Sequence, residues 1–75
     1  MLYHFHIRDQ GTLIRDDEGS DLPDMTAAQV EARASARDLA MEDLRHKQPI
    51  QDRHIEIVDD RGTVLESVAV RSVLN

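Results

Sequence analysis

The chain has 75 residues, which form one small domain (residues 1–75) and leave no room for a second. Hydrophobic residues make up 40% and charged residues 32%, so we expect a small packed core under a strongly solvated surface. The lack of cysteine excludes disulfide scaffolds, thiolate zinc sites and cysteine nucleophiles. No apolar run has the length of a membrane span or a signal-peptide core, which favours a cytoplasmic location.

The charge balance is acidic, with 15 Asp and Glu residues against 9 Lys and Arg and a formal net charge of −6. Most of the excess negative charge lies between Asp9 and Asp24. Nucleic-acid binding depends on basic side chains that neutralise phosphates and on aromatic rings that stack, and Tyr3 and Phe5 are the only aromatic residues. We therefore expect no nucleic-acid binding and no attraction to an anionic membrane surface.

Two strands joined by a tight turn are expected at the start of the chain. Residues 2–8 alternate between apolar and polar side chains, which predicts a strand with one buried face. Residues 9–12 form the turn, where Gly11 supplies the positive φ that hairpins favour. A second strand starts at Leu13 and runs into an acidic segment.

One long helix is predicted to follow, uninterrupted by Gly or Pro up to Pro49. Asp24 or Thr26 can cap its N-terminus, and Thr26 with Gln29 fits a capping box. The inward stripe is expected to recur at three- and four-residue spacing: Met25, Ala28, Ala32, Ala36 and Leu39. A weaker apolar stripe nearly opposite offers a surface for a partner: Val30, Ala34 and Met41.

Two further strands are expected at residues 54–58 and 63–70, around a turn at 59–62. The last strand has apolar residues on both faces, so either a bulge near Glu66 or burial of both faces would reconcile its pattern. The tail, residues 71–75, would extend this strand or fray.

The predicted fold class is therefore α+β. The order is β-β-α-β-β in a two-layer sandwich, a mainly antiparallel four-stranded sheet with one helix on one face. That arrangement leaves one sheet face uncovered, and we expect this face to carry polar and apolar residues: His4, His6, His54 and part of the set Val64, Val68 and Val70. A two-fold homodimer would cover the apolar part. The alternative is a monomer whose tail, with Val73 and Leu74, folds back over the face.

His4 and His6 are the clearest candidates for a site, because residues two apart on a strand project from the same face. His54 on another strand could join them and complete a three-histidine metal site. The alternative, which we favour, is that all three occupy polar positions on the open face of the sheet. We accordingly predict no metal and no cofactor.

The acidic run at residues 16–21 invites a calcium interpretation, but an EF-hand register would put Ile14 and Met25 at ligand positions that need oxygen. Two interpretations of this segment remain open, a weak cation site and a solvated turn. Glu66 is either a buried carboxylate or an outward residue beside a bulge, and the second is favoured. No nucleophile elbow or phosphate-binding glycine loop is present, so we predict that the protein is not an enzyme.

The motifs together resemble a family of short bacterial proteins catalogued only as a domain of unknown function. The resemblance is carried by five segments: residues 3–9, Asp17-Glu18-Gly19, Leu22-Pro23-Asp24, the Ala/Arg-rich helix and residues 55–65. It implies no activity. In its strand, hairpin and helix the chain is also similar to the antitoxin half of HicA/HicB-type toxin–antitoxin pairs, which bind a basic ribonuclease toxin.

The leading functional hypothesis is a non-enzymatic interaction module that forms a homodimer. The first alternative is an antitoxin-like or regulatory partner of a basic protein, which the acidic surface would suit. The second is a histidine-based metal-binding protein.

Overall fold

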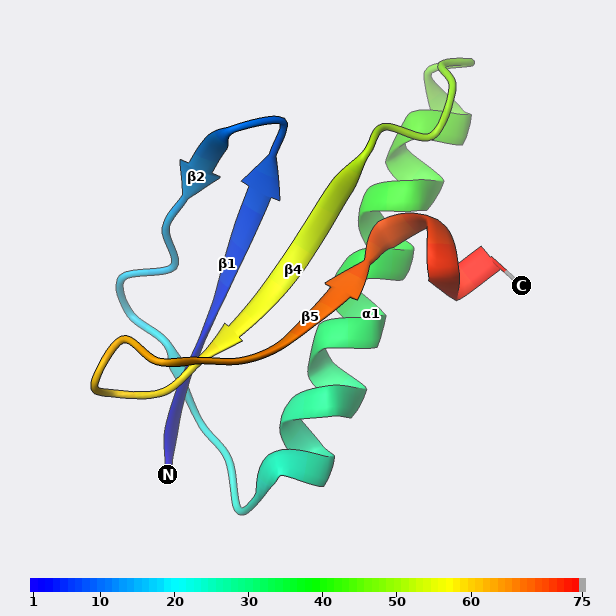
Figure 1. Ribbon diagram of the computed structural model, residues 1–75. Helices are drawn as coiled ribbons and strands as arrows, with labels where there is room; N and C mark the ends of the chain where they lie inside the picture. The colour runs from blue at the N-terminus through cyan, green and yellow to red at the C-terminus, as the bar shows by residue number, and fades with distance from the viewer. Residues whose placement is uncertain (75) are drawn as a thin grey trace.

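An antiparallel sheet carries a single long helix on one face in the computed structural model, which describes residues 1–74 (Figure 1). The elements are β1 (Leu2–Asp9), β2 (Thr12–Ile14), β3 (Ser20–Asp21), α1 (Met25–Arg45), β4 (Arg53–Val58), β5 (Val64–Ala69) and the 3-10 helix η1 (Val70–Leu74). The predicted α+β class, with a mainly antiparallel sheet and one helix, is confirmed. The two-residue strand β3 was not expected, because so short a segment has no periodicity to detect.

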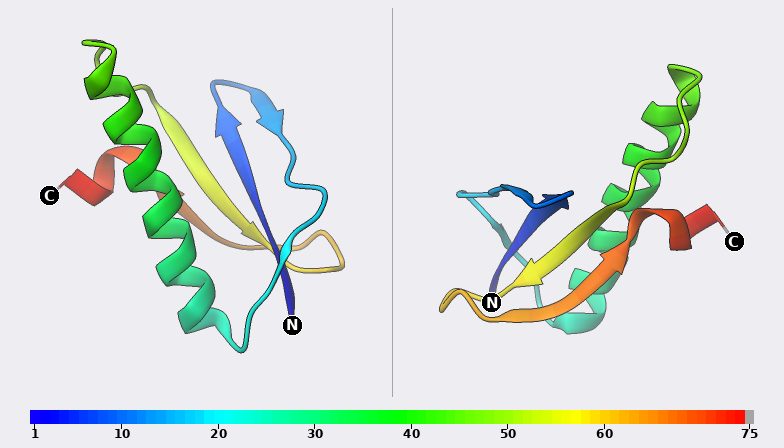
Figure 2. Two further views of the ribbon diagram at one scale, coloured as in Figure 1. Left: turned by 180° about the vertical axis from the view of Figure 1, so that it is seen from behind. Right: turned by 45° about the horizontal axis from the view of Figure 1, so that its top comes forward.

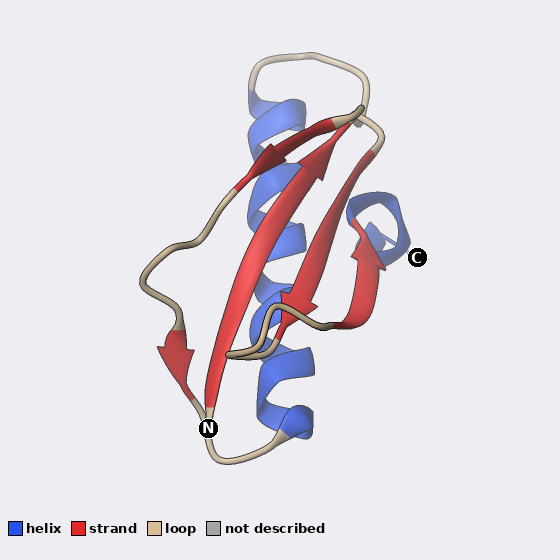
Figure 3. Ribbon diagram, turned by 60° about the vertical axis from the view of Figure 1, so that its left-hand side comes forward, coloured by secondary structure: helices blue, strands red, loops and turns tan. Residues whose placement is uncertain are grey.

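The strands lie in the order β2-β1-β4-β5, so the first strands of the two hairpins are neighbours at the centre of the sheet (Figure 3). On its other edge β1 has two partners in succession. Its C-terminal part pairs with β2, where Ile7 faces Ile14, and its N-terminal part pairs with β3, where Tyr3 faces Ser20. The middle of that edge has no strand partner, and this gap defines the site described below.

The β1–β2 turn has the predicted form. Asp9 pairs with Thr12 across two residues, Gln10 and Gly11, whose φ values are 50° and 89°. Two-residue hairpin loops favour positive φ at both positions because that twist matches the twist of the strands.

Alanine residues spaced four apart form the face of α1 that packs on the sheet. Four of them are fully buried: Ala28, Ala32, Ala36 and Ala40. Across from them lie the buried side chains of the sheet and η1: Tyr3, Ile55, Ile57, Val68 and Val70. A row at this spacing runs obliquely to the helix axis, and its small side chains allow close approach to a twisted sheet. The predicted stripe is confirmed at its alanines, while Met25 and Leu39 are only partly buried at its margin.

Both ends of α1 are closed by hydrogen bonds. Asp24 is the N-cap, and its side chain accepts a hydrogen bond from the Ala27 N–H at 2.9 Å. The helix ends at Arg45, three residues before the predicted stop at Gln48. Lys47 is left-handed there, with φ of 56°, and the N–H of Gln48 donates to the carbonyl of Asp43 in a Schellman arrangement. A left-handed residue therefore ends the helix before Pro49 can do so.

A bulge in β5 resolves the ambiguous pattern of that strand. Val58 pairs with Val64 and Ile57 with Glu66, which leaves Leu65 as the extra residue. Val68 then pairs with Ile55 on the helix side and is 7% exposed, whereas Val64 is 52% exposed. Of the three valines expected in part on the uncovered face, Val64 lies there, whereas Val68 does not, because the bulge changes the side on which the later residues lie.

The tail folds differently from either expectation. Instead of extending β5 or fraying, residues 70–74 turn into η1, which lies against α1 (Figure 2). Val70 is fully buried and Val73 packs at the edge of the core, so the tail covers the helix side rather than the open sheet face. The predicted conformation of Asn75 lies outside the described residues.

A buried ion pair joins the end of α1 to the start of β4. Arg53 Nη2 donates to Asp43 Oδ2 at 2.6 Å, and these side chains are only 13% and 7% exposed. The same carboxylate oxygen accepts from the N–H of Gln51, and Arg53 also donates to the Leu39 carbonyl. This pair fixes the direction in which the chain leaves the helix and enters the sheet.

We expect Asp43→Ala to lower the free energy of unfolding by about 3–5 kcal/mol, because it leaves the guanidinium of Arg53 buried without a counter-charge. Urea unfolding followed by circular dichroism measures the loss. Asp38→Ala, which removes an exposed aspartate from the same helix, is the matched control and should change stability little. Equal losses in the two variants would contradict a specific role of the ion pair.

Substitution of β5 valines tests which face of the strand is buried. Val68→Asp should lower the free energy of unfolding by about 3–5 kcal/mol, because the new carboxylate would be buried without a partner. Val64→Asp should leave the thermal transition nearly unchanged, since Val64 is already half exposed. If Val64→Asp were destabilised and Val68→Asp were as stable as the wild type, the buried and exposed faces of β5 would be the reverse of those described.

Candidate functional site

Asp16 fills the gap in the ladder between β2 and β3. Its carboxylate accepts two backbone hydrogen bonds, from the N–H of Phe5 to Oδ2 at 3.1 Å and from the N–H of Gly19 to Oδ1 at 3.2 Å. The Phe5 N–H lies at the middle of β1, where neither short strand reaches. One side chain thus takes the place of a strand partner, and it ties the acidic loop to the centre of the sheet.

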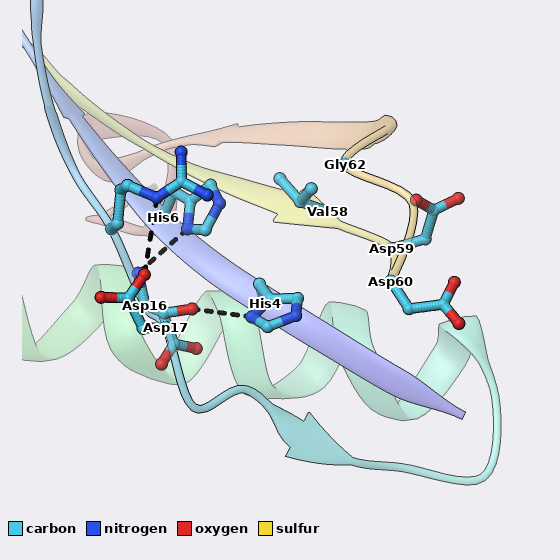
Figure 4. Close-up of a pocket in the computed structure, with 9 residues that line it drawn as sticks. His4, His6, Asp16, Asp17, Val58, Asp59, Asp60 and Gly62 are labelled. Atoms are coloured by element: carbon cyan, nitrogen blue, oxygen red, sulfur yellow. Dashed lines mark hydrogen bonds and ion pairs between the residues drawn. The ribbon is translucent and has the colours of Figure 1, made fainter.

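The peptide groups of Asp16 contact both histidines of β1. Its N–H donates to His6 Nδ1 at 3.0 Å, and its carbonyl oxygen lies 2.7 Å from His4 Nδ1 (Figure 4). An N–H can only donate and a carbonyl can only accept, so His6 has no proton on Nδ1 and His4 has one there. In the neutral rings, His6 therefore presents Nε2–H as a donor, and His4 presents a bare Nε2 as an acceptor.

Gly19 permits the close approach of this loop to β1. Its φ is +73°, and a Cβ at this position would lie 2.9 Å from the Tyr3 carbonyl oxygen and 3.1 Å from His4 Cε1. Both the backbone conformation and the lack of space require glycine here. The glycine of the acidic run therefore serves the packing of the loop.

A pocket of about 130 Å³ lies between β1, the loop after β2 and the β4–β5 turn. Figure 4 shows His4 and His6 on one side of it, with Asp59 and Asp60 across from them. The two rings are 5.9 Å apart between centroids and tilted by 38°, and His6 is only 7% exposed. Val58 forms part of the wall between the histidines and the turn.

The rim of the pocket is acidic. Asp16, Asp17, Asp59 and Asp60 face a single cation, Arg15, so with neutral histidines the ionisable lining has a formal charge of −3. Arg15 lies 3.5 Å from Asp17 in an exposed ion pair.

The turn itself holds the opposite wall in place. Asp59 Oδ1 accepts hydrogen bonds from the N–H groups of Arg61 and Thr63, both at 2.9 Å. This short loop conformation is therefore determined by the same aspartate that lines the pocket.

The structure does not bring His54 together with the other two histidines. His54 lies on the same sheet face, but it pairs with Arg8 farther along the strands, and its Nε2 is 3.4 Å from Asp52. Across residues 1–74, no three His, Asp or Glu side chains converge as a metal ion requires. The hydrogen bond to His6 Nδ1 also opposes a two-histidine chelate, because ligation through Nε2 would leave two donors facing each other.

The sheet face opposite α1 is mostly polar along β1 and β4, although Val58 and Val64 also lie on it. Beside the histidines, Arg8 Nε donates to Glu56 Oε2 at 3.3 Å across β1 and β4. Glu66, by contrast, lies on the helix side, where its Oε1 accepts from Gln29 Nε2 at 3.0 Å. The predicted outward position of Glu66 is therefore wrong, while the predicted bulge beside it is correct.

The outer edge of β5 is a second feature of interest. Within residues 1–74 no strand pairs with this edge, which lies at one side of the sheet (Figure 3). Leu65 is 43% exposed beside it, next to a shallow apolar groove that Tyr3 and Met25 also line. β5 is paired with β4 on its inner side only, so the backbone N–H and C=O groups that point to its outer edge have no strand partner among the described residues.

Sequence reasoning identified His4 and His6 but missed the other side of their pocket. Asp16 was visible only as one of a run of acidic residues, and no local pattern marks it as the member that bonds to β1. Asp59 and Asp60 come from a turn more than 40 residues away in sequence, so only tertiary contact brings them to the histidines.

A family model for a domain of unknown function, DUF6894, matches residues 2–71. The match covers nearly the whole chain, so the protein belongs to this family, and the predicted membership of a family of unknown function is confirmed. No curated protein and no solved structure matched the chain. The similarity to HicB-type antitoxins stays a prediction.

None of the helices within residues 1–74 combines the length and the apolarity needed to cross a bilayer.

Asp16→Ala should lower the free energy of unfolding by about 1–3 kcal/mol, because it removes the acceptor for two backbone donors. Amide hydrogen exchange at Phe5 should accelerate more than exchange elsewhere in β1. Asp17→Ala, which removes the neighbouring carboxylate that is 85% exposed, is the control. If Phe5 remained as protected in Asp16→Ala as in Asp17→Ala, the proposed replacement of a strand partner would be refuted.

Proposed function

We propose that this protein is a cytoplasmic, non-enzymatic interaction module that forms a homodimer through the free edge of β5. The observation that carries the proposal is the unpaired backbone along that edge. Exposed N–H and C=O groups in a row are a template for another strand, and natural proteins block such edges when pairing is unwanted.

The usual blocking devices are weak on β5. The strand contains no Lys, Arg or Pro, and its one charged side chain, Glu66, is directed to Gln29 on the helix. The bulge lies at Leu65, toward one end, and residues 66–69 keep a regular register with β4. At least this regular part is available to a further strand.

A second copy of β5 is a suitable occupant. In an antiparallel pairing centred on Ser67, Glu66 lies opposite Val68 of the second copy, so no like charges oppose each other directly. Centring the pair on Glu66 would set two carboxylates opposite one another. The Ser67-centred register is therefore the one we propose, and a two-fold axis generates it from a single sequence.

We expect a weak dimer. Pairing two strands of six residues buries less than the roughly 1,200 Å² that marks the lower end of stable interfaces. The mass should therefore change with concentration over the micromolar to millimolar range.

Ser67→Lys tests this proposal, because it brings two ammonium groups together at the centre of the pair while its exposed position leaves the monomer intact. Sedimentation velocity should show the wild-type mass rising with concentration toward that of two chains. Ser67→Lys should remain a single chain, with at least a tenfold weaker association, which corresponds to about 1.4 kcal/mol.

Thr12→Lys is the matched control, because it adds the same charge to an exposed residue on the opposite edge strand, β2. It should associate as the wild type does. A wild-type mass of one chain at every concentration would refute the dimer, and equal effects of the two substitutions would show that net charge, rather than the β5 edge, controls association.

A further inference from the structure

The pocket beside His4 and His6 presents an ordered set of hydrogen-bonding groups. His6 Nε2–H is a donor with no acceptor among the described residues, on a ring that is only 7% exposed. In its neutral form, His4 offers Nε2 as an acceptor on the adjacent ring. Because Asp16 contacts both rings through its peptide groups, the donor and the acceptor cannot exchange positions without breaking a hydrogen bond of the backbone.

The charge of the lining restricts the ligand further. Four aspartates line the same pocket as these two nitrogens, against one arginine that already lies beside Asp17. Carboxylates and phosphates would be repelled, whereas an ammonium group would find acceptors at His4 and at the Asp59–Asp60 side. A ligand made only of donors, however, would place an N–H against the N–H of His6.

We propose that this pocket binds an α-amino amide, in which an ammonium group stands next to a carbonyl oxygen. The carbonyl oxygen accepts from His6 Nε2–H, and the ammonium group donates to His4 Nε2 and to the aspartates across the pocket. The volume of about 130 Å³ is far below that of pockets for drug-sized ligands and suits a single residue. Two sources share this chemistry, a free amino-acid amide and the first residue of a peptide.

A series of small probes tests the carbonyl oxygen and the ammonium group of the ligand separately. Glycinamide carries both groups, ethylammonium lacks the carbonyl, acetamide lacks the charge, and glycine adds a carboxylate. Binding is followed by chemical-shift changes of the His4 and His6 ring resonances during titration of the full chain. We expect glycinamide to bind at least several-fold more tightly than each of the other three.

His6→Asn removes the donor at the position of Nε2 and keeps the fold, because the amide oxygen of asparagine can replace Nδ1 as the acceptor for the Asp16 N–H. It should reduce glycinamide affinity to the level of ethylammonium and leave ethylammonium binding unchanged. Asp60→Asn tests the negative charge of the pocket independently. It should weaken the binding of glycinamide and of ethylammonium several-fold. Glu18→Gln, an exposed acidic residue outside the pocket, is its control and should weaken neither.

The source of the ligand is tested with glycylglycinamide. Binding as tight as that of glycinamide identifies a peptide N-terminus, and binding of glycinamide alone identifies a free amide; both support the proposal. Equal affinity for ethylammonium and glycinamide would overturn it, because the donor of His6 would then make no contribution. Absence of any shift at the histidine rings with glycinamide would overturn it as well.

Discussion

The hydrogen bonds of Asp16 connect the parts of this small domain that no regular element connects. On one edge, β1 is paired at its two ends by β2 and β3, and at its middle by a single carboxylate. The same residue directs the backbone from one short strand to the next and sets the protonated nitrogen on two histidines. The shape of the sheet edge and the chemistry of the neighbouring pocket therefore depend on one residue, which is an economical arrangement for a domain with so few strands.

The opposite side of the sheet follows a different constraint, the small size of the buried helix residues. A row of alanines brings α1 close to the sheet, so the core contains few large side chains and is completed by Val70 and Val73 from η1. The ion pair between Asp43 and Arg53 closes the far end of this layer. Burial of two charges costs desolvation energy, and the extra hydrogen bonds to Leu39 and Gln51 offset part of it.

The two features to which we assign function, the β5 edge and the histidine pocket, lie on different parts of the molecule and would bind different chemical groups. In the proposed dimer the β5 edge pairs with backbone, so its specificity would come from register and from the position of the Glu66 charge. In the proposed binding mode the histidine pocket would recognise a small group through a donor, an acceptor and an acidic rim. Because the pocket uses β1 and the β4–β5 turn, while the edge uses residues 66–69, binding at one does not require occupation of the other.

Local sequence patterns determined the α+β class, the first hairpin and the alanine face of α1, and they narrowed its N-cap to Asp24 or Thr26. Each depends on neighbours within a few residues, where periodicity, turn chemistry and capping act. The side of Val68, the fold of the tail, the pairing of Asp43 with Arg53 and the meeting of His4 with Asp59 were decided only by the tertiary structure. A one-residue bulge changes the side on which every later residue of β5 lies, and contacts between residues far apart in the chain depend on the strand order, which no local pattern encodes.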